Sequence, residues 1–304
     1  MGSKILISGG SGLVGSYLSE LLALEGYEVV HLSRQRHNKG IYHTFLWDID
    51  QEYIEEGAFE GVECIVHLAG AGVADKRWTQ DRKKLLTSSR VDSANLIHQY
   101  LKKGSHQVSS FISASAIGIY GFDTGAILQS EDRTQLGDDF LASLTKKWEA
   151  AADQFQDLGL RVVKLRLGLV LSDKGGLLAR LRPLSGLGLG AALGDGEQYM
   201  SWIHIQDLAR LILKAVRSKE MSGVYNAVAP NPVSNEEFMK QLASTLGKPY
   251  FMPHIPKFAL RIVLGELASV VAGGNRVSSE KIVSSGFSFR FTDLKAAIDH
   301  LLKH

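Results

Sequence analysis

Residues 4–15 read KILISGGSGLVG, and this stretch decides the fold. Its apolar opening predicts a buried parallel strand, and residues 13–24 continue with the spacing of a helix. The glycines therefore fall at the turn from strand to helix. Gly9 permits the tight turn, Gly12 lets the backbone approach a pyrophosphate, and Gly15 lets the helix pack closely on the sheet. The stretch predicts a dinucleotide-binding turn, with a merely structural glycine turn as the alternative.

The next strand bears on which dinucleotide would bind. Residues 28–32 (EVVHL) are typical of a strand, and Ser33 and Arg34 follow it. A site for NAD usually places a carboxylate here for the ribose 2′-hydroxyl, whereas a site for NADP offers a cation to the 2′-phosphate. Arg34 can bind a phosphate with two hydrogen bonds, and the Ser33 hydroxyl can add a third. Arg36 and Lys39 add positive charge nearby. We predict NADP as the cofactor, with a solvated basic loop as the alternative.

The composition excludes several classes of function. A net charge of +2 over 304 residues, with no long basic tract, argues against a nucleic-acid surface. The single cysteine, Cys64, excludes an intramolecular disulfide framework and fits a reducing compartment. The apolar stretch Phe258–Gly274 carries charges and predicts an amphipathic helix, not a membrane span. No signal peptide is expected before the first strand, and the histidines and carboxylates lack metal-ligand spacing, so we expect a cytoplasmic protein without a metal.

Strand-like and helix-like segments alternate through the first half of the chain, which is typical of βαβ units and a parallel sheet. We expect an α/β fold: a Rossmann-type parallel sheet with helices on both faces, plus a small mixed C-terminal substrate lobe. Residues 1–170 and 203–229 form the predicted NADP-binding domain, and residues 171–202 and 230–304 the lobe. The expected strands are 4–8, 28–32, 43–47, 62–68, 108–114 and 160–167, and the expected helices are 13–25, 79–103 and 138–158.

Beyond Val170 the pattern changes. Gly175-Gly176 and the stretch at 185–198 are expected to form glycine-rich loops. Residues 203–216 predict a helix and residues 224–226 a short strand. The remainder is expected to be mostly helical.

Four later motifs resemble those of one large protein group. They are HLAG at 67–70, SASAIGIYG at 113–121, LRLGLVL at 165–171 and WIHIQDLA at 202–209. With the glycine turn, they resemble the extended short-chain dehydrogenase/reductase superfamily, which contains the sugar-nucleotide epimerases. The resemblance implies that HLAG lies beside the adenine and ribose, and that the 113–121 segment carries a catalytic serine.

A narrower resemblance covers essentially the whole chain. The runs LAGAGVADKRWTQDRKKLLTSSRVDS, GDDFLASLTKKWEAAA, GLGLGAALGDGEQYMSWIHIQDLA and SSEKIVSSGF resemble the "epimerase family" subfamily, which has a characteristic C-terminal extension and is sometimes labelled a cell-division inhibitor. The resemblance implies cofactor contacts at Gly9, Ser11, Gly12, Leu13, Val14, Gly15, Ser33, Arg34, Leu68, Ala69, Gly70, Arg90 and Val170. For Arg90 the alternative to a cofactor contact is an exposed arginine on a helix.

The catalytic pair of active members is missing. Those members use Tyr-x-x-x-Lys on the helix after the fifth strand, where the lysine lowers the pKa of the tyrosine. None of the nine tyrosines has a lysine four residues later. If Glu149 matches the family's glutamate on that helix, the pair falls on Leu141 and Thr145, and neither side chain can do acid–base work.

Other residues are candidates for the missing chemistry. Ser115 matches the superfamily serine that holds a substrate oxygen, and Tyr120 is the nearest phenol in the sequence. Lys146 and Lys147 follow the expected lysine position, but a solvated charge pair is their expected role. His204 is either a titrating group in the cleft or a structural hydrogen-bonding residue.

Two functions are consistent with this pattern. The first is an NADP-dependent oxidoreductase or epimerase of a small polar substrate, in which Ser115 and Tyr120 are catalytic. The second is an NADP(H)-binding regulator, for example of cell division. We expect a small-molecule substrate, no nucleic-acid or membrane partner, and a homodimer as one form of assembly.

Overall fold

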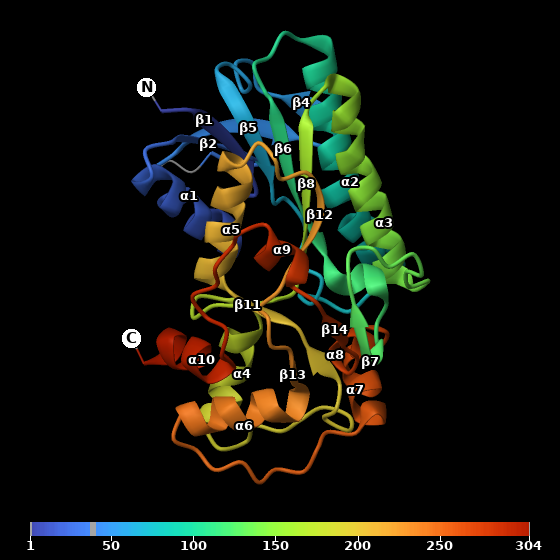
Figure 1. Ribbon diagram of the computed structural model, residues 1–304. Helices are drawn as coiled ribbons and strands as arrows, with labels where there is room; N and C mark the ends of the chain where they lie inside the picture. Colours follow the sequence, from blue (N-terminus) through green and yellow to red (C-terminus); the bar gives the residue numbers. More distant parts are fainter. Residues whose placement is uncertain (1, 37–40, 304) are drawn as a thin grey trace.

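The computed structural model describes residues 2–36 and 41–303. These residues form an eight-stranded sheet in the order β12-β8-β6-β5-β1-β2-β3-β4 (Figure 1). All neighbours pair in parallel except β4, which is antiparallel to β3. The strands are β1 (Lys4–Ser8), β2 (Glu28–Ser33), β3 (His43–Asp48), β4 (Tyr53–Ile54), β5 (Val62–His67), β6 (Ser110–Ala116), β8 (Arg161–Leu167) and β12 (Gly223–Ala227).

The order of the strands creates a switch point beside β1. The chain adds β2 and β3 on one side of β1, and then crosses to place β5, β6 and β8 on the other side. In open α/β sheets, ligands bind beyond the carboxyl ends of the strands at such a switch point. The glycine turn follows β1 directly, so it lies at this position.

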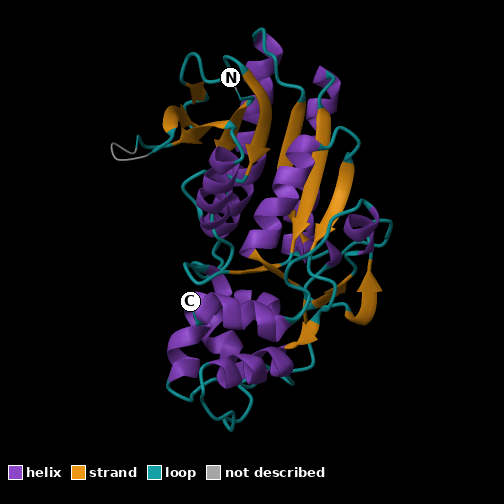
Figure 2. Cartoon of the chain, turned by 60° about the vertical axis from the view of Figure 1, so that its left-hand side comes forward, coloured by secondary structure: helices purple, strands orange, loops and turns teal. Residues whose placement is uncertain are grey.

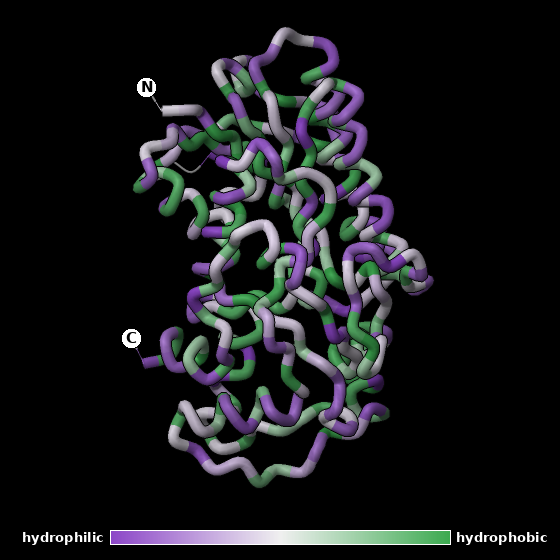
Figure 3. The backbone as a smooth tube through the Cα atoms, in the orientation of Figure 1, coloured by the Kyte–Doolittle hydropathy of each residue, from purple (hydrophilic) through white to green (hydrophobic). Residues whose placement is uncertain are grey.

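Helices cover both faces of the sheet (Figures 1 and 2). The side chains of β1 alternate, so that Ile5 and Ile7 join one core and Leu6 joins the other, as expected for a strand buried on both sides. The outer helices show alternating hydrophilic and hydrophobic segments, most clearly along α3 (Phe140–Asp153; Figure 3). One face carries α1 (Leu13–Leu24) and α5 (Ile205–Arg217), and the other carries α2 (Gln80–Lys103), α3 (Phe140–Asp153) and η2 (Gln154–Leu158).

A smaller lobe lies beyond the carboxyl edge of the sheet (Figure 1). One part of it packs around the fully buried side chains of Trp202 and Phe238. No helix in the described residues is long and apolar enough to cross a bilayer. The remaining elements are η1 (Ile117–Tyr120), β7 (Gly125–Gln129), β9 (Leu169–Leu171), α4 (Gly176–Gly186), β10 (Tyr199–Met200), β11 (Trp202–His204), β13 (Val233–Ser234), α6 (Asn235–Thr245), α7 (Lys257–Leu264), α8 (Leu267–Val271), β14 (Asn275–Val277), α9 (Glu280–Ser284) and α10 (Leu294–Leu302).

The α/β fold class predicted from the sequence is confirmed, but three local predictions were wrong. The helix predicted at 203–216 begins at Ile205, because residues 202–204 form β11 and pair with β9. The single helix predicted at 258–274 is broken at Gly265, whose φ of +62° ends α7 before α8 begins. Gly176, predicted to lie in a loop, is the first residue of α4.

Candidate cofactor cleft and the buried polar network

Glycine is required at two positions of the turn after β1. Gly9 has φ +77°, and a Cβ there would lie 2.8 Å from the carbonyl carbon of Leu68. A Cβ on Gly15 would lie only 2.2 Å from the carbonyl oxygen of Gly9. The backbone N–H of Gly12 donates to that same oxygen at 3.0 Å. The turn therefore depends on a close backbone approach that no larger residue permits.

The outer side of the turn is open and offers unpaired N–H groups. A Cβ on Gly12 would meet only the Gly9 oxygen, at 3.2 Å, within 4 Å. Gly12 caps α1 without a side-chain hydrogen bond, and the described residues provide no acceptor for the N–H groups of Leu13 and Val14. Ser11 is exposed beside them. A helix N-terminus with free N–H groups and space in front of it fits the pyrophosphate of a dinucleotide.

The end of β2 presents an exposed cation, Arg34. Ser33 is the last residue of the strand, and its Oγ accepts a hydrogen bond from the N–H of Gln35 at 3.3 Å. Arg34 is exposed and has no carboxylate partner among the described residues. Arg36 differs, because it is paired with Glu55. Lys39, the other predicted source of charge, lies outside the described residues.

Arg90 is buried beneath the HLAG loop, so the alternative of an exposed helix arginine was wrong. Its guanidinium donates to the carbonyl oxygens of Ala71 at 2.8 Å and Leu86 at 2.9 Å, and lies 5.0 Å from the Trp148 ring centre. Burial lowers the pKa of Arg90 to about 10. A Cβ on Gly70 would lie 2.9 Å from the Arg90 Cζ. The guanidinium therefore supports the loop at 68–71; its direct contact with a cofactor stays a prediction.

Sequence reasoning missed His67, the first residue of the HLAG motif. Its ring bonds the Ser8 hydroxyl on β1 at 2.7 Å and lies 3.2 Å from the Ser93 hydroxyl on α2. Burial lowers the pKa of His67 to about 4, so the ring is neutral at physiological pH. The histidine thus ties the end of β1 to β5 and α2, directly below the glycine turn. The backbone continues this link, because the N–H of Leu68 donates to the Ser8 oxygen at 3.0 Å.

The hydroxyl of Ser115 is committed to a buried carboxylate. Ser115 is 1% exposed, and its Oγ donates to Glu149 Oε1 on α3 at 2.6 Å. Arg166 on β8 holds the same carboxylate with two hydrogen bonds, from Nε at 2.8 Å and from Nη2 at 2.9 Å. The sequence analysis used Glu149 only to locate the positions of the missing Tyr-Lys pair, and it assigned no role to Arg166. The ion pair could have been predicted from two opposite charges that lie within elements expected to be apolar.

Tyr120 belongs to the same set of hydrogen bonds through its contact with Arg166. Arg166 Nη1 donates to the Tyr120 hydroxyl at 3.0 Å, and that hydroxyl lies 2.8 Å from Asn226 Oδ1 and 3.1 Å from the Ser130 carbonyl oxygen. Burial raises the pKa of Tyr120, which opposes its use as a proton donor near neutral pH. Ser115, Glu149, Arg166, Tyr120 and Asn226 together form what we call the buried polar network.

The positions expected for the Tyr-Lys pair contain no titratable group. Thr145 is 2% exposed, and its hydroxyl donates to the Leu141 carbonyl oxygen at 2.7 Å. Lys146 and Lys147 are exposed, and the Lys146 ammonium donates to the Gly137 carbonyl oxygen at 2.8 Å. The structure therefore provides no lysine at the place where the family's catalytic lysine would be.

Val170 and His204 lie on the paired strands β9 and β11. A Cβ on Gly176 would lie 3.3 Å from the Val170 carbonyl oxygen, and one on Gly175 would lie 3.3 Å from Leu13, so this segment adjoins the glycine turn. His204 is buried: its Nδ1 accepts from the N–H of Gln206, and its ring stacks on Phe291 at 3.8 Å. Burial lowers the pKa of His204 to about 3. Of the two roles predicted for His204, the structure gives it the hydrogen-bonding one.

Comparisons with known proteins found similar sequences and structures over almost the whole chain. The model of the NAD-dependent epimerase/dehydratase family matches residues 5–227, and a domain of unknown function, DUF1731, matches residues 255–301. The "Epimerase family protein YfhF" of Bacillus subtilis is 32% identical over 300 residues, with 98% of each chain covered. The crystal structure of human epimerase family protein SDR39U1 with NADPH has a TM-score of 0.88 and 28% identity, and 99% of each chain is covered. A nucleoside-diphosphate sugar epimerase from Corynebacterium glutamicum has a TM-score of 0.80 and 33% identity, over 99% of this chain and 58% of that one.

Proposed function

The chain belongs to the NAD-dependent epimerase/dehydratase family, and we propose that within this family it binds NADP(H). The observation that carries the proposal is Arg34, an exposed arginine at the end of β2 without a carboxylate partner among the described residues. A dinucleotide on the glycine turn would direct its adenosine ribose toward the end of β2, where a cation favours a 2′-phosphate. The human structural relative with NADPH supports this choice, whereas several more distant relatives were solved with NAD.

Each part of the cleft has a distinct task in this proposal. The N–H groups of Leu13 and Val14 donate to the pyrophosphate at the start of α1. Ser33 and Arg34 bind the 2′-phosphate, and the loop at 68–71, supported by Arg90, borders the adenine ribose. When bound, the cofactor supplies a nicotinamide ring that gives or takes a hydride.

Replacing Arg34 tests the cofactor proposal. Arg34→Ala is expected to weaken NADPH binding by about 1.5–3 kcal/mol, the scale of a lost hydrogen bond to a charged group, and to leave NADH binding nearly unchanged. Fluorescence titration of both cofactors measures this difference. Arg36→Ala is the matched control, because Arg36 is already paired with Glu55. Equal losses for NADPH and NADH in Arg34→Ala would contradict the 2′-phosphate assignment.

Two functions follow from cofactor binding, and different observations favour them. The family match favours an oxidoreductase or epimerase, which in this proposal uses NADP(H) and acts on a small polar substrate. In that case the substrate or water supplies the proton, unless the network opens to release Ser115 and Tyr120. The buried polar network favours the second function, an NADP(H)-binding regulator, because the Ser115 and Tyr120 hydroxyls are enclosed and hydrogen-bonded.

Substrate-dependent oxidation of bound NADPH distinguishes these functions. The protein is loaded with NADPH and offered a panel of small carbonyl compounds, and the nicotinamide absorbance is followed. An enzyme is expected to lose absorbance with at least one compound, and Ser115→Ala is expected to slow that loss when the network opens to release Ser115. Ser113→Ala on the same strand is the control, because the Ser113 hydroxyl donates to the neighbouring Ala114 carbonyl oxygen and not to the network. A regulator gives no absorbance loss with any compound, and Ser115→Ala leaves NADPH binding unchanged.

A further inference from the structure

Two ion pairs join the small lobe to the chain around the start of α2. Arg180 on α4 donates to the Ala74 carbonyl oxygen from Nη1 at 2.7 Å and to Asp75 Oδ1 from Nη2 at 2.8 Å. The Lys83 ammonium on α2 donates to both carboxylate oxygens of Glu266, beside α8, at 2.8 and 2.6 Å. Neither pair belongs to the predicted cofactor contacts or to the buried polar network, so both are links between the sheet domain and the lobe.

The two segments that Arg180 joins both continue from predicted cofactor contacts. The contacts predicted at 68–70 lead into the loop that Arg180 bonds, and Val170 leads into α4, which carries Arg180 itself. The glycine turn adjoins both segments, through the HLAG loop and through Gly175. A dinucleotide that lies on the turn and makes the predicted contacts therefore lies between two segments that Arg180 fastens together.

The loop that Arg180 contacts is anchored at its ends and exposed in its middle. We call residues 72–77 the clasp loop. Arg82 on α2 donates to the Gly72 carbonyl oxygen at the start of this loop. The buried Trp78, which follows the loop, donates from Nε1 to the Val73 carbonyl oxygen at 2.9 Å. The last four residues of the loop are exposed, namely Ala74, Asp75, Lys76 and Arg77. The middle of the loop can therefore move while its anchors stay in place.

Of the two links, the one made by Arg180 is the more easily released. The side chains of Arg180 and Asp75 are both 55% exposed, and an exposed ion pair favours its closed arrangement by a factor of about five at most. The Lys83 side chain is only 20% exposed, and its ammonium also lies 4.9 Å from the Phe140 ring centre. The clasp loop can thus separate from α4 while Lys83 keeps the lobe attached.

We propose that Arg180 and the clasp loop form a gate over the cofactor cleft, which opens to admit and release the dinucleotide. This gate rests on the NADP(H) binding proposed above. Arg180 bonds groups of the chain and not the cofactor, so closure is equally stable over an empty and a loaded cleft. Removing Arg180 should therefore speed entry and exit by the same factor and leave the Kd unchanged. A residue that binds the cofactor itself, such as Arg34, should instead raise the Kd when it is removed.

Stopped-flow fluorescence measures the association and dissociation rate constants of NADPH separately. Arg180→Gln is expected to raise both rate constants by about fivefold, the factor by which the exposed ion pair favours closure, and to keep the Kd within about twofold of the wild type. Arg180 is changed rather than Asp75, because Asp75 also lies 3.9 Å from Arg82.

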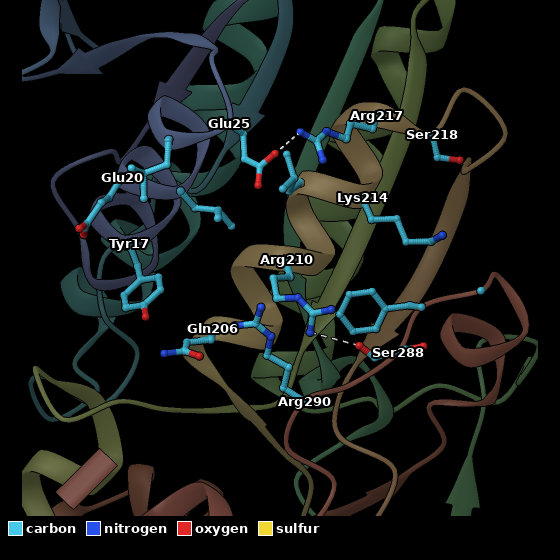
Figure 4. A pocket seen from close by; sticks show the side chains of 15 residues that line it. Tyr17, Glu20, Glu25, Gln206, Arg210, Lys214, Arg217, Ser218, Ser288 and Arg290 are labelled. Atoms are coloured by element: carbon cyan, nitrogen blue, oxygen red, sulfur yellow. Dashed lines mark hydrogen bonds and ion pairs between the residues drawn. The ribbon is translucent and has the colours of Figure 1, made fainter. Parts of the chain in front are cut away.

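Two matched variants control for charge and for the loss of an ion pair. Arg182→Gln removes the charge of another exposed arginine on α4, two residues further along the helix. Arg217→Gln removes an exposed ion pair with Glu25, which joins α5 to α1 beside a groove whose lining includes neither Arg180 nor the clasp loop (Figure 4). Neither control should raise the two rate constants together.

The outcomes separate failure of the gate from failure of cofactor binding. Normal NADPH binding with unchanged rate constants in Arg180→Gln would refute the gate alone, and so would a raised Kd with faster dissociation only. A wild-type protein that binds no NADPH would refute the proposed function and the gate with it. Hydrogen exchange of residues 72–77 in the cofactor-free protein should be faster in Arg180→Gln than in Arg182→Gln, and equal exchange would overturn the gate whether or not NADPH binds.

Discussion

Removing Arg166 tests how much the buried polar network stabilises the fold. The side chains of Arg166 and Glu149 are only 6% and 9% exposed, and they share two hydrogen bonds of 2.8 and 2.9 Å. Arg166→Met would leave the Glu149 carboxylate buried with Ser115 as its one remaining partner among the described residues. Breaking a buried ion pair in this way typically costs about 3–5 kcal/mol, a large part of the roughly 5–15 kcal/mol that stabilises a folded domain.

The same reasoning predicts that a second substitution will restore stability. Glu149→Leu alone leaves the Arg166 guanidinium without its carboxylate partner. We expect a loss of unfolding free energy similar to that of Arg166→Met. The double variant removes both charges and leaves unpaired only the Ser115 hydroxyl, because Tyr120 keeps Asn226 and Ser130 as partners. The double variant should therefore be more stable than either single variant.

Equilibrium urea unfolding of the wild type and the three variants measures these differences. If the double variant loses about the sum of the two single losses, the pair does not interact as the structure indicates and the reasoning is wrong. The result also bears on the serine. Ser115→Ala removes a hydrogen bond to a charged group, which we expect to cost about 1.5–3 kcal/mol of stability whether or not the protein is an enzyme. Activity assays of that variant therefore need unfolding measurements beside them.

Three further predictions concern the turn, the histidines and the cysteine. Gly15→Ala places a Cβ 2.2 Å from the Gly9 carbonyl oxygen, so it should abolish NADPH binding in titrations and lower the unfolding temperature; wild-type affinity would contradict the close approach. His67 and His204 have pKa values lowered to about 4 and about 3, so between these values and pH 6.5 the unfolded chain binds more protons and stability must fall as the pH falls, by up to about 1.4 kcal/mol per pH unit for each ring. Urea unfolding from pH 7 to pH 4 checks this, and a flat profile would show that these rings do not stay neutral. Cys64 should react with a thiol reagent only after denaturation, and rapid labelling of the native protein would show that it is not buried.

Local pattern predicted the sheet well because its strands are short apolar runs with clear boundaries. The glycine turn could also be predicted from the sequence, since the spacing at 9, 12 and 15 follows from the same close backbone approach that the structure shows. The small lobe was harder to predict. Gly265 and Gly176 have positive φ, yet one interrupts a helix pattern and the other begins a helix. Glycine marks a change of backbone direction without specifying which element follows.

Side-chain partners across the sheet were beyond the reach of local pattern. Ser115 and Glu149 are 34 residues apart, and Tyr120 and Asn226 are 106 residues apart. The sequence shows a serine, a tyrosine and an arginine in apolar surroundings. Whether such groups face a substrate or each other depends on the register of β6 and β8, which only the folded chain determines. For this reason the predicted roles of Ser115 and Tyr120 are still predictions.

The network also explains why restoring the missing pair would not rebuild a familiar active site. A lysine at position 145 would replace a 2% exposed threonine, and its ammonium would need a partner that the Leu141 carbonyl oxygen alone does not supply. The nearby acid, Glu149, is already neutralised by Arg166 and bonded to Ser115. A new lysine would thus have to compete with Arg166 for the carboxylate or remain buried without a counter-charge. The absence of the pair is therefore coupled to the packing of α3 against β6 and β8, and a lysine at position 145 would require that packing to change.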